Sequence, residues 1–368
     1  MNVNQPGKPV ESSRPTARDV AQRAGVSQST VSRILAGHES TFFSQGTRQR
    51  VLEAARELGY SPDPNARALR GKQTKQIGLI VRDISDPFFA ELVSALIGEA
   101  RTAGYQAVLG YARIGPHETL HTSHVLDTRQ TDGVIILGDW WDDEQAIREI
   151  IAVQRAVVAM CRGASPAEVL TINTDNRSGI LDLCEHLVAL GHYRLGFLQG
   201  TWMGDFDERH AAFQEFIQTG RAETRPEWLI PDTDDAPGGY RAMQRLLACP
   251  ERPTAVLAAD DLMAIGALKA VADQGLSVPD DLSIAGFDGI SMAGYVHPAL
   301  TTVRQPVEAM GRQAFDGLLA QIRNEPLPAV RLVRVPPLLV VRESTARVGL
   351  RTSMVRSSIP ESETVQRR

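Results

Sequence analysis

The stretch that decides the fold of the N-terminal region is TARDVAQRAGVSQSTVSRIL, residues 16–35. Thr16 is placed to cap a first helix together with Asp19, and Gly25 is placed to end that helix. Ser27 can cap a second helix, whose apolar residues recur at helical spacing. Two short helices joined through a glycine turn predict a helix-turn-helix unit.

The polar residues of the second helix favour contact with nucleic acid. If its apolar residues face inward, the outer face and the cap carry Gln28, Ser29, Thr30, Ser32 and Arg33. An arginine can donate two hydrogen bonds to guanine, a glutamine pairs in the same way with adenine, and hydroxyl groups suit bases or phosphates. A third helix, capped by Ser44 and ended by Gly59, completes a predicted three-helix head. The alternative is a helix-turn-helix that contacts no DNA and carries ordinary Ser and Thr caps.

The charge of the chain is divided unevenly. Residues 1–76 hold 12 Lys and Arg against 6 Asp and Glu, whereas the remaining residues hold 27 against 38, within an overall charge of −5. A basic head on an acidic body is consistent with one module that faces nucleic acid.

Several functional classes are not supported by the composition. The three cysteines, Cys161, Cys184 and Cys249, are widely spaced and predicted to be buried reduced thiols. No Cys/His cluster suggests zinc, so we expect no metal and no cofactor. No apolar run is long enough to span a membrane, and the first residues lack an apolar signal core, so a cytoplasmic protein without a membrane partner is expected.

From residue 77 the sequence alternates short apolar runs with amphipathic segments. The runs at 77–81, 105–111, 132–138, 155–161, 194–200, 254–260 and 282–288 have strand length and are almost continuously apolar. Such strands are typical of parallel sheets covered by helices on both faces. About 270 residues of this pattern exceed one sheet, so the sequence predicts two α/β lobes, with ligands bound where strand ends meet the cleft.

The predicted domain boundaries follow from these changes in composition. We expect a disordered extension at 1–15, the head at 16–60, a hinge linker at 61–76, a two-lobed body at 77–346 and a disordered tail at 347–368. The linker offers barely two turns of helix, which are unstable alone and can form on DNA. Leu69 in this segment, beside Arg67 and Arg70, fits a minor-groove wedge, although it can also be a linker residue without a partner.

The complete layout resembles the lactose-repressor family of bacterial transcription regulators, and the body resembles type I periplasmic sugar-binding proteins. The residues that carry this resemblance occur in order along the chain. They are TxxDVAxxAGVSxxTVSR at 16–33, YSPxxxARxL at 60–69, IGLIV with DPFF at 77–89, DNRxG at 175–179, LGH at 190–192, DDLMAIGA at 260–267, VPDDLSIAGFD at 278–288 and PALTTVRQP at 298–306.

The resemblance implies roles for residues of the head and the hinge. Gln28, Ser29 and Arg33 match positions that read bases in the major groove. Phosphate contacts are implied for Thr16, Ser27, Thr30 and Ser32. Leu69 matches a hinge leucine that family dimers insert into the centre of a near-palindromic operator.

In the body, the resemblance implies an effector site. Arg209, Asp260 and Asp288 match polar effector-binding positions, and Phe88 and Gln305 match other positions that line the cleft. From the residues alone, Asp260 can instead be a helix N-cap and Arg209 a solvated helix residue. Position 260 is Asp where the family more often has Asn, which favours a donor-rich or cationic ligand. Asp234 lies near where the lactose and purine repressors place a stacking aromatic residue.

The function expected from these observations is a homodimeric, operator-binding regulator controlled by a small-molecule effector, a sugar or sugar derivative. Relief of repression by the ligand is the expected polarity, and corepression is the alternative, because linkage runs in either direction. A solute-binding transport component and an α/β enzyme are the rival classes. The basic head argues against the first, and no nucleophile elbow, P-loop or dinucleotide-binding glycine motif supports the second.

Overall fold

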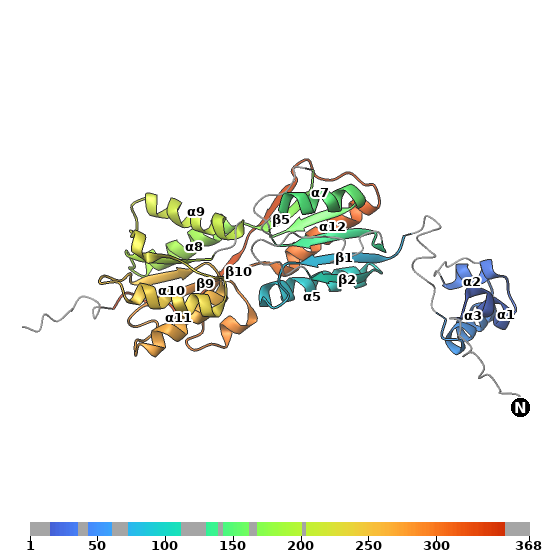
Figure 1. The fold of residues 1–368 in the computed structure, drawn as a ribbon, viewed down its shortest axis with the longest axis horizontal. Coiled ribbons are helices and arrows are strands. Elements are labelled where there is room, and N and C mark those ends of the chain that lie inside the picture. Colours follow the sequence, from blue (N-terminus) through green and yellow to red (C-terminus); the bar gives the residue numbers. More distant parts are fainter. Residues whose placement is uncertain are drawn as a thin grey trace, which may run out of the picture. The chain divides into compact units, whose positions relative to one another are not determined.

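The computed structural model describes residues 15–35, 43–60, 73–111, 130–138, 143–161, 168–200 and 204–349. The chain divides into two compact units, Met1–Thr74 and Lys75–Arg368. We call the first the head and the second the body. Figure 1 shows the three helices of the head and the two sheets of the body.

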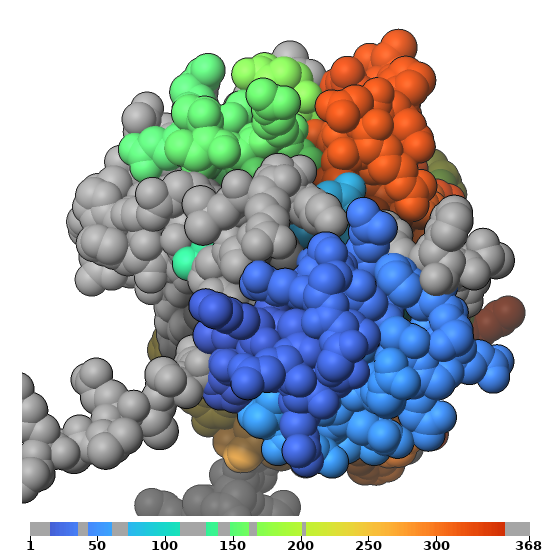
Figure 2. Space-filling view, turned by 90° about the vertical axis from the view of Figure 1, so that its right-hand side faces the viewer, coloured from blue at the N-terminus to red at the C-terminus, as the bar shows by residue number. Residues whose placement is uncertain are grey.

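The head is a small bundle of helices α1 (Ala17–Ala24), α2 (Gln28–Leu35) and α3 (Gln45–Glu57). Its core is formed by short apolar side chains from all three helices, Val20, Ala21, Ala24, Val31, Ile34, Val51, Ala54 and Ala55. Ser44 caps α3 by accepting a hydrogen bond from the backbone nitrogen of Thr47 at 3.2 Å. Figure 2 shows the described residues of these helices, in shades of blue, as one compact unit. The predicted helical head is therefore confirmed.

The first lobe of the body (lobe 1) has a six-stranded parallel sheet in the order β11-β5-β4-β3-β1-β2. Buried residues alternate along its strands: Leu79 and Ile135 face the core that holds Phe315 of α12, whereas Ile80 and Ile136 face Ile150 of α7. Helices therefore cover both faces of the sheet, which explains the nearly continuous apolar strands. Its elements are β1 (Gln76–Val81), α5 (Pro87–Thr102), β2 (Gln106–Tyr111), β3 (Gly133–Leu137), α7 (Asp143–Val153), β4 (Val157–Met160), β5 (Leu170–Thr174), α12 (Val307–Ile322) and β11 (Leu332–Val335).

The second lobe (lobe 2) has the strand order β12-β10-β9-β8-β6-β7, in which β12 is antiparallel to β10 and the other pairs are parallel. Helices α8 and α9 pack together, and α10 packs on α11. The elements of lobe 2 are α8 (Asn176–Ala189), β6 (Leu195–Gln199), α9 (Asp205–Gln218), β7 (Leu229–Pro231), α10 (Ala236–Leu247), β8 (Ala255–Ala258), α11 (Asp261–Asp273), β9 (Ser283–Asp288), β10 (Thr301–Arg304) and β12 (Leu338–Val340). The two parallel α/β lobes predicted from the sequence are confirmed.

The chain passes between the lobes three times within the described residues. The crossings lie between β5 and α8, between β10 and α12, and between β11 and β12. In Figure 1 these connections lie in the middle of the body, between the two sheets. Because parallel strands of each sheet end toward this region, the side chains that follow them can meet between the lobes.

Helices α10 and α11 approach closely through two glycines. A Cβ atom on Gly266 would lie 1.9 Å from the carbonyl oxygen of Ala236, and one on Gly239 would lie 2.1 Å from the carbonyl oxygen of Met263. Both clashes are with backbone atoms, which cannot rotate away. These glycines therefore set the distance between the two helices.

The C-terminal segment of the described chain is held against lobe 2. The ring of His192 hydrogen-bonds through Nδ1 with the hydroxyl of Thr254 at 3.0 Å and through Nε2 with the carbonyl of Ala346 at 2.9 Å. Val348, which lies within the predicted tail at 347–368, donates its backbone N–H to the carbonyl of Leu190 at 3.0 Å. The other predicted tail residues from 350 onward, and residues 1–14, lie outside the described residues.

The three cysteines differ in their burial. Cys161 and Cys184 are buried free thiols, as predicted, and burial raises the pKa of Cys184. Cys249 is only half-buried, which corrects the prediction that all three are buried. It follows the end of α10, where its Sγ lies 3.6 Å from the carbonyl oxygen of Arg245 at an exposed position.

Candidate functional site

The first helix of the head begins with the predicted capping box. The backbone nitrogen of Thr16 donates to the Asp19 carboxylate at 2.8 Å, and the backbone nitrogen of Asp19 donates to the Thr16 hydroxyl at 3.4 Å. The hydrogen bonds that the Thr16 backbone nitrogen and hydroxyl donate to the Asp19 carboxylate lower the pKa of Asp19. Gly25 has a φ of 65°, in the left-handed region, and ends α1. This turn sets the start of α2.

Helix α2 buries one face and exposes the other. Val31 and Ile34 are buried, whereas Gln28, Ser29 and Arg33 are exposed. Arg and Gln side chains in this position carry paired hydrogen-bonding groups that match the edges of guanine and adenine. The exposed face of α2 therefore has the shape and chemistry to enter a major groove.

Hydroxyl groups gather at the start of α2. The Ser27 hydroxyl accepts a hydrogen bond from the Thr30 backbone nitrogen at 3.1 Å and lies 2.8 Å from the hydroxyls of both Ser29 and Thr30. Ser27 is exposed, and Thr30 and Ser32 are half-buried. Thr16 is exposed at the start of α1. All four residues for which phosphate contacts are implied thus lie in the described head, whereas Leu69 lies outside the described residues.

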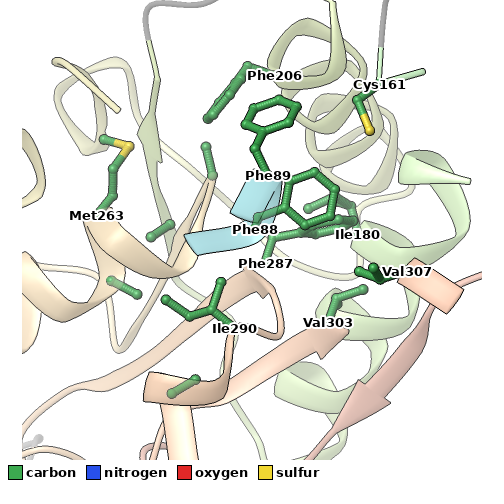
Figure 3. Close-up of a cluster of buried hydrophobic side chains, with 14 of the residues drawn as sticks. Phe88, Phe89, Cys161, Ile180, Phe206, Met263, Phe287, Ile290, Val303 and Val307 are labelled. Carbon is green, nitrogen blue, oxygen red and sulfur yellow. The ribbon is translucent and has the colours of Figure 1, made fainter. Parts of the chain in front are cut away.

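A cavity lies between the lobes of the body, at the ends of the parallel strands. It encloses about 360 Å³ of empty space, part of it open to solvent. Phe88, Phe89, Phe206 and Cys161 belong to the buried cluster in Figure 3 and line the cavity on its apolar side. The polar lining consists of Arg82, Asp86, Asp205, Arg209, Asp288 and Gln305. Aromatic side chains combined with convergent polar groups are typical of a small-molecule site.

Arg209 of α9 is the central cation of this cavity. Its side chain is 3% exposed, and its Nη2 lies 3.1 Å from Oδ1 of Asp288. Nε donates to Oδ1 of Asn176 at 3.0 Å, and Nη1 donates to the carbonyl of Ala259 at 2.7 Å. The guanidinium also lies 3.9 Å from the ring centre of Phe287. Arg209 is therefore fixed in one orientation, and its alternative interpretation as a solvated helix residue is wrong.

Asp288 ends β9 and connects Arg209 to the crossing between the lobes. Gln305 donates its amide to Oδ1 of Asp288 at 2.7 Å and accepts a hydrogen bond from the hydroxyl of Thr174. Burial raises the pKa of Asp288 to about 7, although Arg209 opposes this change. Asp288 also has a φ of 108°, a strained conformation for a residue with a side chain. Strain and a shifted pKa at one cavity-lining residue are typical of a functional position.

Asp260 and Asp261 begin α11 beneath the cavity. Asp260 is the N-cap, because its Oδ1 accepts a hydrogen bond from the Met263 backbone nitrogen at 2.6 Å. Asp261 accepts from the Thr302 hydroxyl at 2.6 Å and from the Ile290 backbone nitrogen at 2.9 Å. Burial, followed by the negative charge of Asp288, raises the pKa of both carboxyls well above the usual value.

Ionic contacts join the two lobes across the cavity. Arg82, which follows β1 in lobe 1, lies 3.8 Å from the Asp86 carboxylate and 3.7 Å from that of Asp234 in lobe 2. Arg334 of β11 makes two hydrogen bonds, at 2.7 and 2.8 Å, with Glu208 of α9. Asp234 thus contributes charge to the cleft. The lactose and purine repressors are expected to have an aromatic residue near this position.

The structure brings four of the five predicted effector residues to the cavity. Phe88, Arg209, Asp288 and Gln305 line it, whereas Asp260 caps α11 and is not among the lining residues. The sequence interpretation missed the cavity residues Arg82, Asp86, Phe89, Cys161, Asp205 and Phe206. Several of them directly follow a strand, as Arg82 follows β1 and Cys161 follows β4, and this position was the available signal.

The described residues contain neither a cluster suited to a metal ion nor a helix suited to a membrane. No group of three or more His, Cys, Asp or Glu residues in the described part of the chain is arranged to hold a metal ion. Within those same residues, no helix combines the length and the apolar composition needed to cross a membrane.

Both units of the chain match known sequence families. Residues 16–63 match the bacterial regulatory proteins of the lacI family, and residues 184–345 match a periplasmic binding protein-like domain. The chain is 34% identical over 336 residues to the HTH-type transcriptional repressor PurR of Erwinia tasmaniensis, covering 90% of this chain and 97% of that protein. It is 35% identical over 313 residues to the HTH-type transcriptional repressor CytR of Escherichia coli (strain K12), covering 84% and 90%.

Solved structures show the same architecture. The lac repressor dimer bound to operator and the anti-inducer ONPF matches with a TM-score of 0.77 at 27% identity, covering 90% of this chain and 99% of that one. The transcriptional regulator CelR in complex with cellobiose matches with a TM-score of 0.67 at 30% identity, covering 90% and 100%.

These matches extend over both units and agree with the helix-turn-helix head and the two-sheet body. The relatives with this architecture are transcriptional repressors rather than enzymes. The chain therefore belongs to the lacI family of bacterial regulatory proteins, with a DNA-binding head and a periplasmic-binding-protein-like body.

Proposed function

We propose that the protein is a dimeric repressor that binds a near-palindromic operator and is controlled by a small hydroxylated effector, a sugar or sugar derivative. The observation that carries the DNA-binding part is the exposed face of α2, with Gln28, Ser29 and Arg33 opposite the buried Val31 and Ile34. A two-fold dimer places two such faces against two half-sites of one operator. A regulator of this kind acts on chromosomal DNA, so we propose a cytoplasmic location.

The effector part of the proposal is supported by the interlobe cavity and by relatives with bound sugars. Arg209 and Asp288 supply a donor and an acceptor, and Phe88 supplies an aromatic side chain in the same cavity. This set suits hydroxyl groups on one edge of a ring and the apolar face of that ring. The structures of CelR with cellobiose and of an Enterococcus faecium regulator with ribose show such ligands in relatives.

We propose that a ligand in the cavity lowers the affinity for DNA by changing the arrangement of the lobes and hence of the paired hinge segments. The coupling must be reciprocal, so operator DNA lowers the affinity for the same ligand by the same factor. In corepression, both signs are reversed. Leu69 is proposed as the minor-groove wedge of the hinge, and its replacement by Ala is expected to reduce operator bending while leaving the body folded.

The test of the DNA-binding proposal begins with selection of DNA sites from a random pool by the full-length protein, followed by footprinting. We expect a protected near-palindrome. Arg33→Ala is expected to cost about 1–3 kcal/mol and to relax selectivity at one base pair in each half-site. The matched control is Arg23→Ala, because Arg23 is also exposed but belongs to α1 and pairs with Glu57 of α3 at 2.8 Å.

Three results are informative. Loss of selectivity at one base pair for Arg33→Ala alone supports a base contact. An equal loss on all sequences shows that Arg33 contacts phosphate instead. Absence of any sequence-selective protection, with or without small molecules, refutes the proposed function.

A further inference from the structure

A polar network runs from the interlobe cavity to the edge strand of lobe 1. We call it the interlobe network and define it by four residues, Arg209, Asn176, Glu208 and Arg334. Asn176 begins α8 and the next two lie on α9, all in lobe 2, whereas Arg334 belongs to β11 of lobe 1. Each member is hydrogen-bonded to the next, so the network connects a cavity residue to the opposite lobe.

Asn176 is the branch point of the interlobe network. Its side chain is fully buried, and its amide is used on both sides. Oδ1 accepts a hydrogen bond from Nε of Arg209 at 3.0 Å. Nδ2 donates to Oδ1 of Asp205 at 2.9 Å and to Oε2 of Glu208 at 3.0 Å. Because a guanidinium only donates and a carboxylate only accepts, these partners fix which way the amide is turned. Asn176 therefore holds Arg209, which lines the cavity, in one orientation.

Glu208 carries the network across to lobe 1. Its two carboxylate oxygens accept hydrogen bonds from the guanidinium of Arg334 at 2.7 and 2.8 Å, and Oε2 also accepts from Asn176. Burial opposes ionisation, but the hydrogen bonds from Arg334 and Asn176 lower the pKa of Glu208, so this side chain is charged at neutral pH. Two parallel hydrogen bonds between a guanidinium and a carboxylate hold both groups in one relative orientation.

The interlobe network lies where the chain crosses between the lobes. Asn176 follows the crossing from β5, and Arg334 lies in β11, which pairs with β5 and leads into the crossing to β12. The backbone nitrogen of Asp175 donates to the carbonyl of Val335 at 2.9 Å, so these two crossings are also joined to each other. A change in the angle between the lobes bends these segments and moves Glu208 relative to Arg334.

We propose that Asn176 and Glu208 are positioning residues that couple the effector site to the lobe arrangement. Asn176 orients Arg209 in the cavity, and Glu208 ties the same amide to Arg334 of lobe 1. The orientation of Arg209 and the lobe arrangement therefore change together, and a ligand that binds Arg209 favours one arrangement. This inference rests on the proposed function, in which the cavity is the effector site, and goes beyond it by naming the residues through which the lobes respond.

The thiol of Cys161 gives a readout that needs no ligand. Cys161 follows β4 in lobe 1, lines the interlobe cavity and is 4% exposed (Figure 3). Its rate of alkylation by iodoacetamide reports how often the lobes separate. Cys249 is half-buried after α10 and is not among the cavity-lining residues, so it serves as the internal reference. Mass spectrometry of peptides measures the two sites separately in the full-length protein.

Glu208→Gln tests the link between the lobes. Glutamine keeps the size of the side chain but removes the charge, so Arg334 loses its ion pair. We expect Cys161 to react about threefold to fivefold faster, with the rate at Cys249 unchanged. Arg334→Met is expected to have the same effect. The double variant should react no faster than either single variant, because both remove one contact.

The matched control is Glu215→Gln. Glu215 lies on α9, as Glu208 does, and its carboxylate also accepts two hydrogen bonds from an arginine, Arg177 of α8, one of them at 2.8 Å. This pair lies within lobe 2. Its loss is therefore expected to leave the rate at Cys161 at the wild-type value.

Asn176→Asp tests the positioning role. Aspartate still presents an acceptor to Arg209, but it turns a second oxygen toward Asp205 and Glu208 where asparagine has a donor. The interlobe network is then broken at its branch point by repulsion between carboxylates. We expect Cys161 to react faster in this variant.

Combined variants distinguish this role from a general structural one. In the Asn176→Asp background, Arg334→Met is expected to add little to the rate at Cys161, whereas independent structural effects would multiply and would refute the role of Asn176. Arg209→Lys keeps the positive charge but lacks the Nε donor, so it is expected to reduce the effect of Arg334→Met as well. Alkylation of Cys184, which is fully buried in lobe 2, identifies a variant that has unfolded, and Glu208→Gln then decides the test.

Affinity for a selected operator separates this inference from the proposed function. If Glu208→Gln accelerates alkylation of Cys161 and changes operator affinity, and Glu215→Gln does neither, both proposals are supported. If alkylation is faster but operator affinity is unchanged, the interlobe network is supported and control of DNA binding by the lobes is wrong. If Glu208→Gln and Arg334→Met leave the rate at Cys161 equal to that of Glu215→Gln, the inference is overturned, whether or not the protein binds its operator.

Discussion

Replacing Arg209 by Met tests whether the buried guanidinium holds the cleft together. Methionine keeps an unbranched apolar side chain but removes every donor. The carbonyl of Ala259 and Oδ1 of Asn176 lose donors at 2.7 and 3.0 Å, and Asp288 loses its cation at 3.1 Å. Leaving a buried acceptor unsatisfied costs about 1–3 kcal/mol, and removing one partner of a buried ion pair costs about 3–5 kcal/mol. Because these effects overlap, we expect a loss of about 3–5 kcal/mol in the free energy of unfolding.

The loss is also expected to depend on pH. In the wild type, the pKa of Asp288 is about 7 in the folded state, above the usual value of an unfolded aspartate. Because the pKa of Asp288 is higher in the folded state, ionisation of this carboxyl destabilises the fold as the pH rises from the pKa of the unfolded state to the pKa of the folded state. This destabilisation levels off above about pH 7. Without Arg209 the folded pKa rises further, so the destabilisation continues above pH 7. The difference between variant and wild type should therefore grow by up to about 1.4 kcal/mol per pH unit.

Urea unfolding at pH 6, 7 and 8, followed by intrinsic fluorescence, measures both effects, since the buried Trp228 lies in lobe 2. The matched control is Arg221→Met. Arg221 is also in lobe 2, but its side chain is 49% exposed and pairs with the exposed Glu185. Its removal is expected to cost about 0–1 kcal/mol at every pH. Equal shifts for the two variants, or a pH-independent loss for Arg209→Met, would refute the reasoning.

Three further predictions concern stability. Gly266→Ala is expected to lower the free energy of unfolding by about 2 kcal/mol or more, because its Cβ would meet the Ala236 carbonyl at 1.9 Å. The control is Gly98→Ala in α5, where nothing lies within 4 Å of the new Cβ. It should be neutral or slightly stabilising in the same urea titration. Thr16→Ala is expected to cost about 1 kcal/mol in the head, seen as faster amide hydrogen exchange in α1, and Thr16→Ser should retain protection if the cap is the cause. Burial lowers the pKa of His192, so the contribution of this residue to stability is fully present above about pH 6.5 and is lost as the pH falls. His192→Gln should flatten the dependence of the unfolding free energy on pH between pH 7 and 5. An unchanged dependence would assign it to other groups.

Most of the fold could be predicted from local sequence patterns. The caps at Thr16 and Ser44 and the stop at Gly25 mark the ends of helices, and nearly continuous apolar runs mark buried parallel strands. Strand β5 was missed because its sequence, LTINT, contains three polar residues, although Thr171, Asn173 and Thr174 are all buried. Polar side chains can be buried there because the strand leads into a crossing between the lobes, which no local pattern shows.

The cleft could be predicted only in part, for the same reason. Asp288 and Gln305 could be placed by resemblance, and the structure shows them hydrogen-bonded. The contact of Arg209 with Asn176 joins positions 33 residues apart, and that of Thr174 with Gln305 joins positions 131 residues apart. Such pairs depend on tertiary structure. Resemblance placed Asp260 in the effector site, whereas the structure shows it as the N-cap of α11 and not among the lining residues.

The interleaved path of the chain has a consequence for biosynthesis. Sheet β11-β5-β4-β3-β1-β2 receives its last strand only at Leu332–Val335, and the other sheet receives β12 only at Leu338–Val340. A nascent chain can therefore fold its head early on the ribosome, while neither half of the body is complete until β11 and β12 have been translated. A premature stop anywhere before residue 332 would leave β5 and β10 without the strands that pair with them in the complete sheets, which would favour aggregation or degradation over a half-functional sensor.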